Sequence, residues 1–318
     1  MTRARTFGLL VLVGFGASAS AQDGTVVARD TMRFSEAARA DLGRYVAARL
    51  DAGEAASAFD RVVVERITYL VGGLRVAGYL ATPRDGTRLP AVVYNRGGTG
   101  DFGALDSVGV VAVLVPLAAR GYVVAASQYR GTSGSEGRDE YGGADVADVL
   151  ALLPLLDRHP LVDPARIGMV GASRGGLMTY LALARTDRLR AAVVQSGLSD
   201  AHAQVAARPE METEVLSQLV PDWDAGREAA LDARSPVLWA DRLHTETPLL
   251  LLHGTADDRV KPETALAMTA ALLRAGHPVR LVLYEGADHG LAPFRREAFA
   301  ETLRWLDRYV RAPLPDAP

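Results

Sequence analysis

The amino-acid sequence predicts an α/β protein in which a mostly parallel central sheet is covered by helices on both faces. Three observations support this fold class. From residue 89 onward, short apolar runs alternate with segments of helical periodicity. The apolar runs are continuous, which is typical of strands that are buried on both faces. The chain has 318 residues and 49% hydrophobic content, enough for one large core.

The first 21 residues have the features of a secretory signal peptide. Arg3 and Arg5 precede an apolar stretch, residues 7–17, that is too short to span a membrane. Ala19-Ser20-Ala21 fits a cleavage site, so the mature chain would begin at Gln22. We therefore expect an exported protein, periplasmic or secreted, with no stable membrane insertion after the signal is removed. An uncleaved anchor is the alternative.

The main domain is expected over residues 60–312, preceded by a helical extension over 22–59 and followed by a tail over 313–318. The extension is expected to be helical because apolar residues recur at helical spacing over 34–50. Two hairpin strands and six further strands are expected at residues 61–70, 73–82, 90–94, 122–128, 166–170, 191–195, 248–252 and 279–284. Helices are expected at residues 110–119, 145–156, 262–275 and 294–310. Pro116 must kink the first of these helices or mark its true start.

About fifty residues between the sixth and seventh expected strands interrupt the alternation. They contain segments of helical character at residues 201–207, 211–219 and 228–231. Because a long insertion at the carboxyl edge of such a sheet is where a lid lies, we predict a small helical lid over residues 198–246. Its Glu210 and Glu212 are candidates for holding a substrate amine, although a solvated helix face is the favoured interpretation.

A glycine-flanked turn with a serine at its centre follows the apolar run 167–170. The turn reads Gly171-Ala172-Ser173-Arg174-Gly175, and a helical pattern comes after it. A strand, this turn and a helix in that order are typical of a nucleophile elbow, whose strained backbone raises the serine above the sheet edge. The alternative is a glycine-rich turn that merely contains a serine.

An activated serine needs a histidine base and an acid that orients the histidine. In α/β-hydrolases these groups follow in the order serine, acid, histidine. His289 comes after the last expected strand, at the carboxyl end where active sites lie, whereas His277 precedes that strand. The acid should follow the strand before it, where Asp257 and Asp258 are adjacent. The residues alone do not choose between the two aspartates.

The composition excludes several classes of function. The chain has no cysteine, which rules out disulfides, thiolate catalysis and cysteine-ligated metals. A net charge of −3 gives no electrostatic case for a nucleic-acid partner. Serine-based hydrolysis requires no metal and no cofactor, so none is expected.

Four motifs together resemble the catalytic domain of the prolyl oligopeptidase family of serine peptidases. They are Gly171-Ala172-Ser173-Arg174-Gly175-Gly176, Ser235-Pro236-Val237, His253-Gly254-Thr255-Ala256-Asp257-Asp258-Arg259-Val260 and Asp288-His289-Gly290. The resemblance spans about residues 60–312. It implies an α/β-hydrolase fold, and it implies that Asp257 is the acid. Peptidases of the family usually carry an N-terminal β-propeller, and we expect too few residues before this domain to build one, so small esters are alternative substrates.

An oxyanion hole needs two donors where negative charge develops on the attacked carbonyl. We expect one to be the backbone N–H of Arg174, the residue after the serine. Gly98 is the expected second donor, because glycine lets the backbone approach the substrate; an ordinary turn at Gly97-Gly98 is the alternative. Arg96 stands where relatives often have histidine, and it is a candidate substrate contact.

The sequence therefore predicts an exported serine hydrolase that works through an acyl-enzyme on Ser173, with His289 as the base and Asp257 as the acid. The favoured activity is that of a serine-type peptidase on short peptides or acylated amino acids. A carboxylic ester hydrolase on small esters and a catalytically silent binding protein are the alternatives. The sequence leaves the oligomeric state open.

Overall fold

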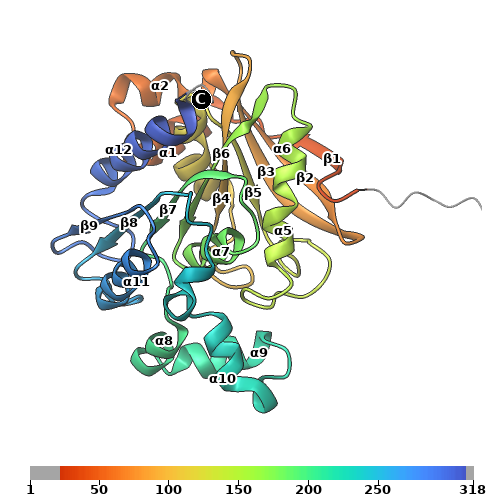
Figure 1. The fold of residues 1–318 in the computed structure, drawn as a ribbon. Coiled ribbons are helices and arrows are strands. Elements are labelled where there is room, and N and C mark those ends of the chain that lie inside the picture. Colours follow the sequence, from red (N-terminus) through yellow and green to blue (C-terminus); the bar gives the residue numbers. More distant parts are fainter. Residues whose placement is uncertain (1–21, 313–318) are drawn as a thin grey trace, which may run out of the picture.

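A nine-stranded sheet forms the centre of the computed structural model, which describes residues 22–312 (Figure 1). In order across the sheet the strands are β1 (Val26–Thr31), β2 (Val62–Val71), β3 (Leu74–Pro83), β5 (Val123–Ser127), β4 (Leu89–Asn95), β6 (Val162–Ala172), β7 (Leu189–Gln195), β8 (Leu249–Gly254) and β9 (Val279–Tyr284). The pairs from β1 to β5 are antiparallel, and those from β5 to β9 are parallel. The predicted signal peptide and the C-terminal tail lie outside the described residues.

Helices cover both faces of the sheet and create two cores. One layer contains α5 (Val146–Leu150), α6 (Leu152–Asp157), α7 (Arg174–Leu183) and α11 (Pro262–Arg274). The other contains α1 (Glu36–Ala47), α2 (Ala52–Arg61), α4 (Val115–Ala119) and α12 (Arg295–Leu306). Strand β4 shows why the strand sequences are continuously apolar: Ala91 and Val93 pack into the first core, and Val92 and Tyr94 into the second.

The predicted elements are confirmed, with differences at their ends. Strands β2 and β3 form the expected hairpin and pair along their whole length. The helix expected at 110–119 consists of α3 (Ser107–Gly109), a π-helical segment η1 (Val110–Leu114) and α4. Pro116 lies in the first turn of α4, directly after the π-helical segment, so the irregularity of the helix coincides with the proline. Helix α12 continues into the π-helical segment η5 (Asp307–Arg311).

Strand β6 begins at Val162, four residues before the predicted start at 166. Its first part contains Asp163 and Pro164 and is partly exposed, so it lacks the apolar pattern from which the strand was predicted.

The prediction of a helical extension over 22–59 is wrong in part, because the segment contains a strand as well as α1 and α2. Residues 26–31 form β1, which pairs with β2 at the edge of the main sheet. Helix α2, which lies almost wholly within that predicted extension, buries Ala58 and Phe59 against the same core as Leu42 and Val46 of α1. The segment is thus part of the domain, because its strand extends the sheet and its helices close one core.

The insertion between β7 and β8 forms a separate helical group at the bottom of Figure 1. It comprises α8 (Ala201–Ala207), the π-helical η2 (Met211–Leu216), α9 (Ser217–Leu219), α10 (Trp223–Ala233) and the 3₁₀ turns η3 (Pro236–Leu238) and η4 (Ala240–Arg242). Several hydrogen bonds connect it to the sheet-edge loops, including two at 2.8 Å. Arg234 Nε donates to Tyr141 O at 2.8 Å, and Gln204 Nε2 donates to Arg259 O at 2.8 Å.

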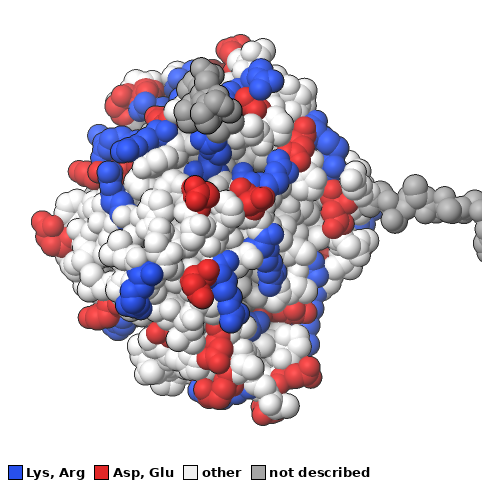
Figure 2. All heavy atoms as spheres, in the orientation of Figure 1, with Lys and Arg blue, Asp and Glu red and all other residues white. Residues whose placement is uncertain are grey.

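The surface carries charges of both signs. Figure 2 shows basic and acidic side chains interspersed over the described part of one face. Of the helices within residues 22–312, none has the length and apolar character needed to cross a membrane.

Candidate active site

Ser173 occupies a strained turn between β6 and α7, with φ 56° and ψ −123°. Both flanking positions require glycine, because neighbouring backbone atoms leave no room for a Cβ. A Cβ at Gly171 would lie 2.0 Å from the carbonyl oxygen of Gly175, and a Cβ at Gly175 would lie 2.0 Å from that of Asn95. The turn therefore packs directly against its neighbours and presents the Ser173 hydroxyl at the positive end of α7.

Asp257 and His289 form a close pair beside this turn. His289 Nδ1 is 2.8 Å from Asp257 Oδ2, and the backbone N–H groups of Arg259 and Val260 each donate to Asp257 Oδ1 at 2.9 Å. His253 Nε2 lies 3.3 Å from the same Oδ2. Burial alone would raise the pKa of Asp257, but the hydrogen bonds from His253 and His289 outweigh it and hold that pKa well below its usual range. The carboxylate is therefore ionised throughout the neutral range.

The structure resolves the choice between the two adjacent aspartates. Asp258 is exposed, and within residues 22–312 no hydrogen bond involves its side chain. His253, which chain order excludes as the base, supports Asp257 from the other side instead. It is buried, and its Nε2 also lies 2.8 Å from Val260 O.

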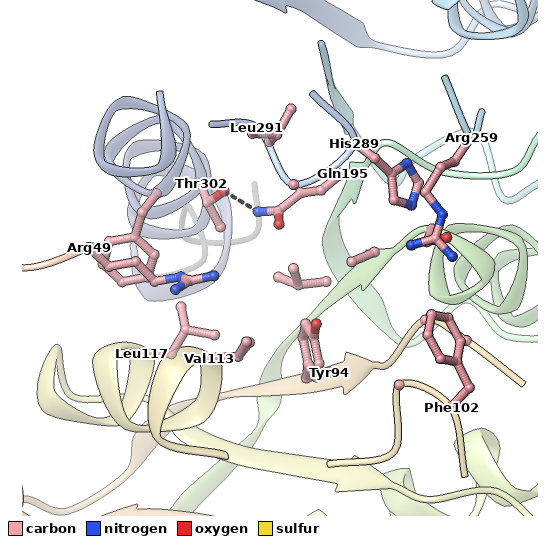
Figure 3. A pocket seen from close by; sticks show the side chains of 18 residues that line it. Arg49, Tyr94, Phe102, Val113, Leu117, Gln195, Arg259, His289, Leu291 and Thr302 are labelled. Atoms are coloured by element: carbon pink, nitrogen blue, oxygen red, sulfur yellow. Dashed lines mark hydrogen bonds between the residues drawn. The ribbon is translucent and has the colours of Figure 1, made fainter. Parts of the chain in front are cut away.

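Ser173 lies where two cavities meet. The first, which we call the His289 cavity, has a volume of about 300 Å³ and is lined by Ser173, Gly98 and His289 (Figure 3). The second, the Arg174 cavity, has a volume of about 380 Å³ and is lined by Ser173, Gly98 and Arg174, with Met211 from the insertion as part of its wall. The two cavities provide space on both sides of the serine.

The loop after β4 brings Gly98 to the serine. Arg96 Nη1 donates to Gly97 O at 3.0 Å. In a trans peptide the C=O and N–H groups point in opposite directions, so this bond directs the Gly98 N–H away from Arg96. Position 98 requires glycine, because its φ is +76° and an added Cβ would lie 2.0 Å from Phe102 O. Within residues 22–312, the N–H groups of Gly98 and Arg174 donate to no described acceptor.

The prediction that Arg96 contacts the substrate is wrong. Its side chain is only 1% exposed and is turned away from both cavities. The guanidinium binds the carbonyl oxygens of Gly97, Gly100 and Gln128 and lies over the Tyr129 ring at 4.9 Å. These backbone acceptors satisfy a buried cation, so Arg96 fixes the shape of the loop instead.

Arg174 connects this loop to a third segment. Its buried guanidinium pairs with Asp139 and Asp145, and its Nη1 donates to Gly98 O at 3.2 Å. The Tyr141 ring lies 4.6 Å from the guanidinium. Both terminal nitrogens of the guanidinium are therefore engaged, whereas Nε has no hydrogen-bond partner among the described residues.

The acidic residues of the insertion lie on a solvated helix face, as the favoured interpretation of the sequence predicts. Glu210 pairs with Arg208 at 3.0 Å, and Glu212 pairs with Arg227 at 2.5 Å. Both are surface ion pairs. Among the described residues, no group of three or more histidine, aspartate or glutamate side chains is arranged to hold a metal ion.

Besides Arg259, from the loop after β8, four polar residues that the sequence did not single out line the His289 cavity: Arg49, Tyr94, Gln195 and Thr302 (Figure 3). They come from the end of α1, from β4, from β7 and from α12. Each lies in or beside an element whose pattern indicates only packing. The sequence contains no signal that these positions meet, because their proximity depends on how both helical layers close over the sheet.

Residues 109–312 match the sequence pattern of the prolyl oligopeptidase family. The uncharacterized peptidase YtmA of Bacillus subtilis (strain 168) is 29% identical over 244 residues, which are 76% of this chain and 91% of that protein. Dipeptidyl-peptidase 5 of Porphyromonas gingivalis is 30% identical over 206 residues, which are 61% of this chain and 30% of that protein. The matched region 109–312 contains Ser173, Asp257 and His289.

A solved structure of a puromycin-hydrolyzing peptidase from Mycobacterium tuberculosis superposes on the chain with a TM-score of 0.64 at 29% identity. The superposition covers 75% of this chain and 38% of that one. The predicted α/β-hydrolase fold is confirmed. The chain thus spans most of the length of YtmA, but only about a third of the length of the dipeptidyl-peptidase and of the puromycin-hydrolyzing peptidase.

The Arg174–Asp139 pair gives a prediction about stability and pH. Replacing Asp139 with Asn leaves the buried guanidinium short of one charge partner, so we expect the free energy of unfolding at pH 7 to fall by about 3 kcal/mol. Burial would raise the pKa of Asp139, but hydrogen bonding and the charge of Arg174 lower it overall. The difference in free energy of unfolding between the wild type and Asp139→Asn is therefore fully present above about pH 4, the ordinary aspartate pKa. It is lost as the pH falls below that value.

Urea unfolding of both proteins between pH 7 and pH 3 measures this difference. Asp41→Asn is the control, because the Asp41 side chain is 66% exposed and its removal should change stability by less than about 0.5 kcal/mol. A pH-independent gap, or none at pH 7, would contradict the prediction.

Proposed function

Because the chain belongs to the prolyl oligopeptidase family of serine peptidases, we propose that it hydrolyses short peptides or acylated amino acids through an acyl-enzyme on Ser173. The observation that carries the proposal is the 2.8 Å contact between His289 Nδ1 and Asp257 Oδ2 at the wall of the cavity that holds Ser173. This contact fixes the imidazole so that Nε2, on the opposite edge of the ring, is free to accept the serine proton.

In the first half of the reaction, Ser173 Oγ attacks the carbonyl carbon of the scissile bond while His289 Nε2 takes the hydroxyl proton. The tetrahedral intermediate carries its negative charge on the former carbonyl oxygen. The N–H groups of Arg174 and Gly98 donate to that oxygen. The intermediate collapses as His289 gives its proton to the leaving nitrogen, and the acyl group remains on Ser173.

In the second half, water attacks the acyl-enzyme with His289 again as the base, and the acid product leaves Ser173 free. Asp257 stabilises the imidazolium that forms twice in the cycle. Its lowered pKa keeps it negatively charged, so it can hold the Nδ1 proton in both halves.

Arg96 acts on this chemistry as a positioning residue. Its bond to Gly97 O orients the peptide whose N–H is the proposed second oxyanion donor. Arg174 holds the other side of Gly98 through the carbonyl oxygen. Preorganised donors are effective because no reorientation is needed when charge develops.

The first prediction of this mechanism concerns Ser173. The Ser173→Ala variant should lose activity by a factor on the order of 10⁶ with an intact fold, because no acyl-enzyme can form. The assay compares p-nitrophenyl esters of short acids with aminoacyl and dipeptidyl p-nitroanilides, with the variant as the blank. Turnover of esters alone would replace the peptidase by an ester hydrolase. Failure of every substrate, together with no labelling of Ser173 by a fluorophosphonate, would contradict the proposal.

The second prediction concerns Arg96. The Arg96→Lys and Arg96→Met variants should lower kcat by about 10- to 100-fold with little change in KM, because a misdirected donor weakens binding of the transition state alone. Arg88→Lys, at a 78% exposed side chain, is the matched control and should leave both constants unchanged. Thermal unfolding separates this effect from lost stability. An equal change of KM and kcat in a stably folded variant would contradict the positioning role.

We also propose that the chain is exported. Arg3, Arg5 and the apolar residues 7–17 support this, and so does the small-residue site that ends at Ala21. Full-length chain produced in a Gram-negative host should appear in the periplasmic fraction with Gln22 as its first residue by mass spectrometry. A cytoplasmic or membrane-bound product that retains residues 1–21 would argue against export with cleavage.

A further inference from the structure

The His289 cavity extends from Ser173 to Arg49 at the end of α1. Figure 3 shows the Arg49 guanidinium directed into the cavity. The side chain is partly buried, and no described residue forms an ion pair or a hydrogen bond with it. Burial lowers the pKa of Arg49, yet an arginine remains charged at neutral pH. A cation in this position has lost part of its hydration without gaining an acidic partner.

The rest of the cavity suits an anion with an apolar body. Among the described residues that line it, none is an aspartate or a glutamate. Tyr94 and Gln195 add polar groups, and the Gln195 Nε2 donates to Thr302 Oγ1 at 3.1 Å. Between them the walls are apolar and include Val113, Leu117, Leu291 and Phe299. Aliphatic walls with a few convergent polar groups are typical of a ligand site.

The backbone around Arg49 is held in place by its buried neighbours. Its neighbours Val46 and Leu50 are 0% and 1% exposed, and both pack into the core. Arg296 of α12 donates from Nη2 to Ala47 O at 2.7 Å, which ties the end of α1 to the opposite wall of the cavity. A fixed backbone lowers the entropy that binding would cost.

The position of His289 indicates which part of a substrate enters this cavity. The histidine must deliver its proton to the leaving nitrogen, so the leaving group has to lie beside it. His289 lines the cavity that contains Arg49 and does not line the Arg174 cavity. The leaving group therefore lies toward Arg49, and the acyl group lies toward the insertion.

We propose that Arg49 binds the free carboxylate of the leaving amino acid. The substrates are then short peptides or N-acyl amino acids whose scissile bond precedes a single C-terminal residue with an apolar side chain. A volume of about 300 Å³ suits a ligand of that size. Arginine binds a carboxylate through two parallel hydrogen bonds, which gives geometric selection as well as attraction. This inference rests on the proposed function and adds a substrate class to it.

The test compares alanyl-leucine and N-acetyl-alanyl-leucine with the same compounds as C-terminal carboxamides. Wild-type protein should prefer the carboxylate form by about 10- to 100-fold in kcat/KM, the range expected for a hydrogen-bonded charged group. The Arg49→Gln variant should bring this ratio to about one, and Arg49→Lys should restore part of it. Arg44→Gln is the matched control, because it removes a charge from α1, the helix that Arg49 follows, at a 65% exposed side chain that pairs with Asp41. It should leave the ratio unchanged.

The outcomes separate this inference from the proposed function. Serine-dependent turnover with a ratio near one in wild-type protein, or an unchanged ratio in Arg49→Gln, overturns the role of Arg49 and leaves the peptidase intact. If no substrate is turned over, the proposed function fails, and calorimetry with leucine and leucinamide decides about Arg49. Binding of leucine alone, lost in Arg49→Gln, supports a carboxylate site, whereas equal or absent binding of the two compounds overturns it.

Discussion

The active site depends on the contacts of one buried side chain, that of Arg174. It follows the serine directly, and its guanidinium pairs with Asp139 and Asp145 while holding the carbonyl of Gly98. Three segments that are distant in sequence are joined at one cation. Because a buried arginine tolerates no loss of its acidic partners, the loops cannot separate without a large free-energy cost. The proposed oxyanion donors are therefore fixed relative to Ser173 by the same contacts that stabilise the fold.

The proposed catalytic pair is stabilised in a similar way. Asp257 receives two backbone N–H groups on one oxygen and two histidines on the other. The backbone groups fix the orientation of the carboxylate, so His289 has one preferred position at the cavity wall. His253 contacts Asp257 at 3.3 Å although it is itself buried. Both buried charges, Asp257 and Arg174, are satisfied by groups from the loops that end the strands, which is where an open α/β sheet places its ligands.

The N-terminal segment links the fold to specificity. Strand β1 extends the sheet, and helices α1 and α2 close one core, so the segment is required for the architecture. The end of α1 also forms one wall of the His289 cavity. In the proposed mechanism, the insertion bounds the acyl side of the serine and the N-terminal segment bounds the leaving-group side. Differences in either segment would then alter substrate choice without changing the triad.

The sequence by itself determined the strand–helix alternation, the elbow at Ser173 and the placement of His289, because these depend on local pattern and on chain order. It left Asp257 and Asp258 equivalent, since the direction of adjacent side chains is set by the loop that carries them. It assigned Arg96 to the substrate because a charge beside a glycine pair gives no indication of burial. The tertiary structure decided these points, and it alone brought Arg49, Tyr94, Gln195 and Thr302 to one cavity. Contacts between distant elements depend on how the helical layers close over the sheet, and periodicity within one element carries no information about that closure.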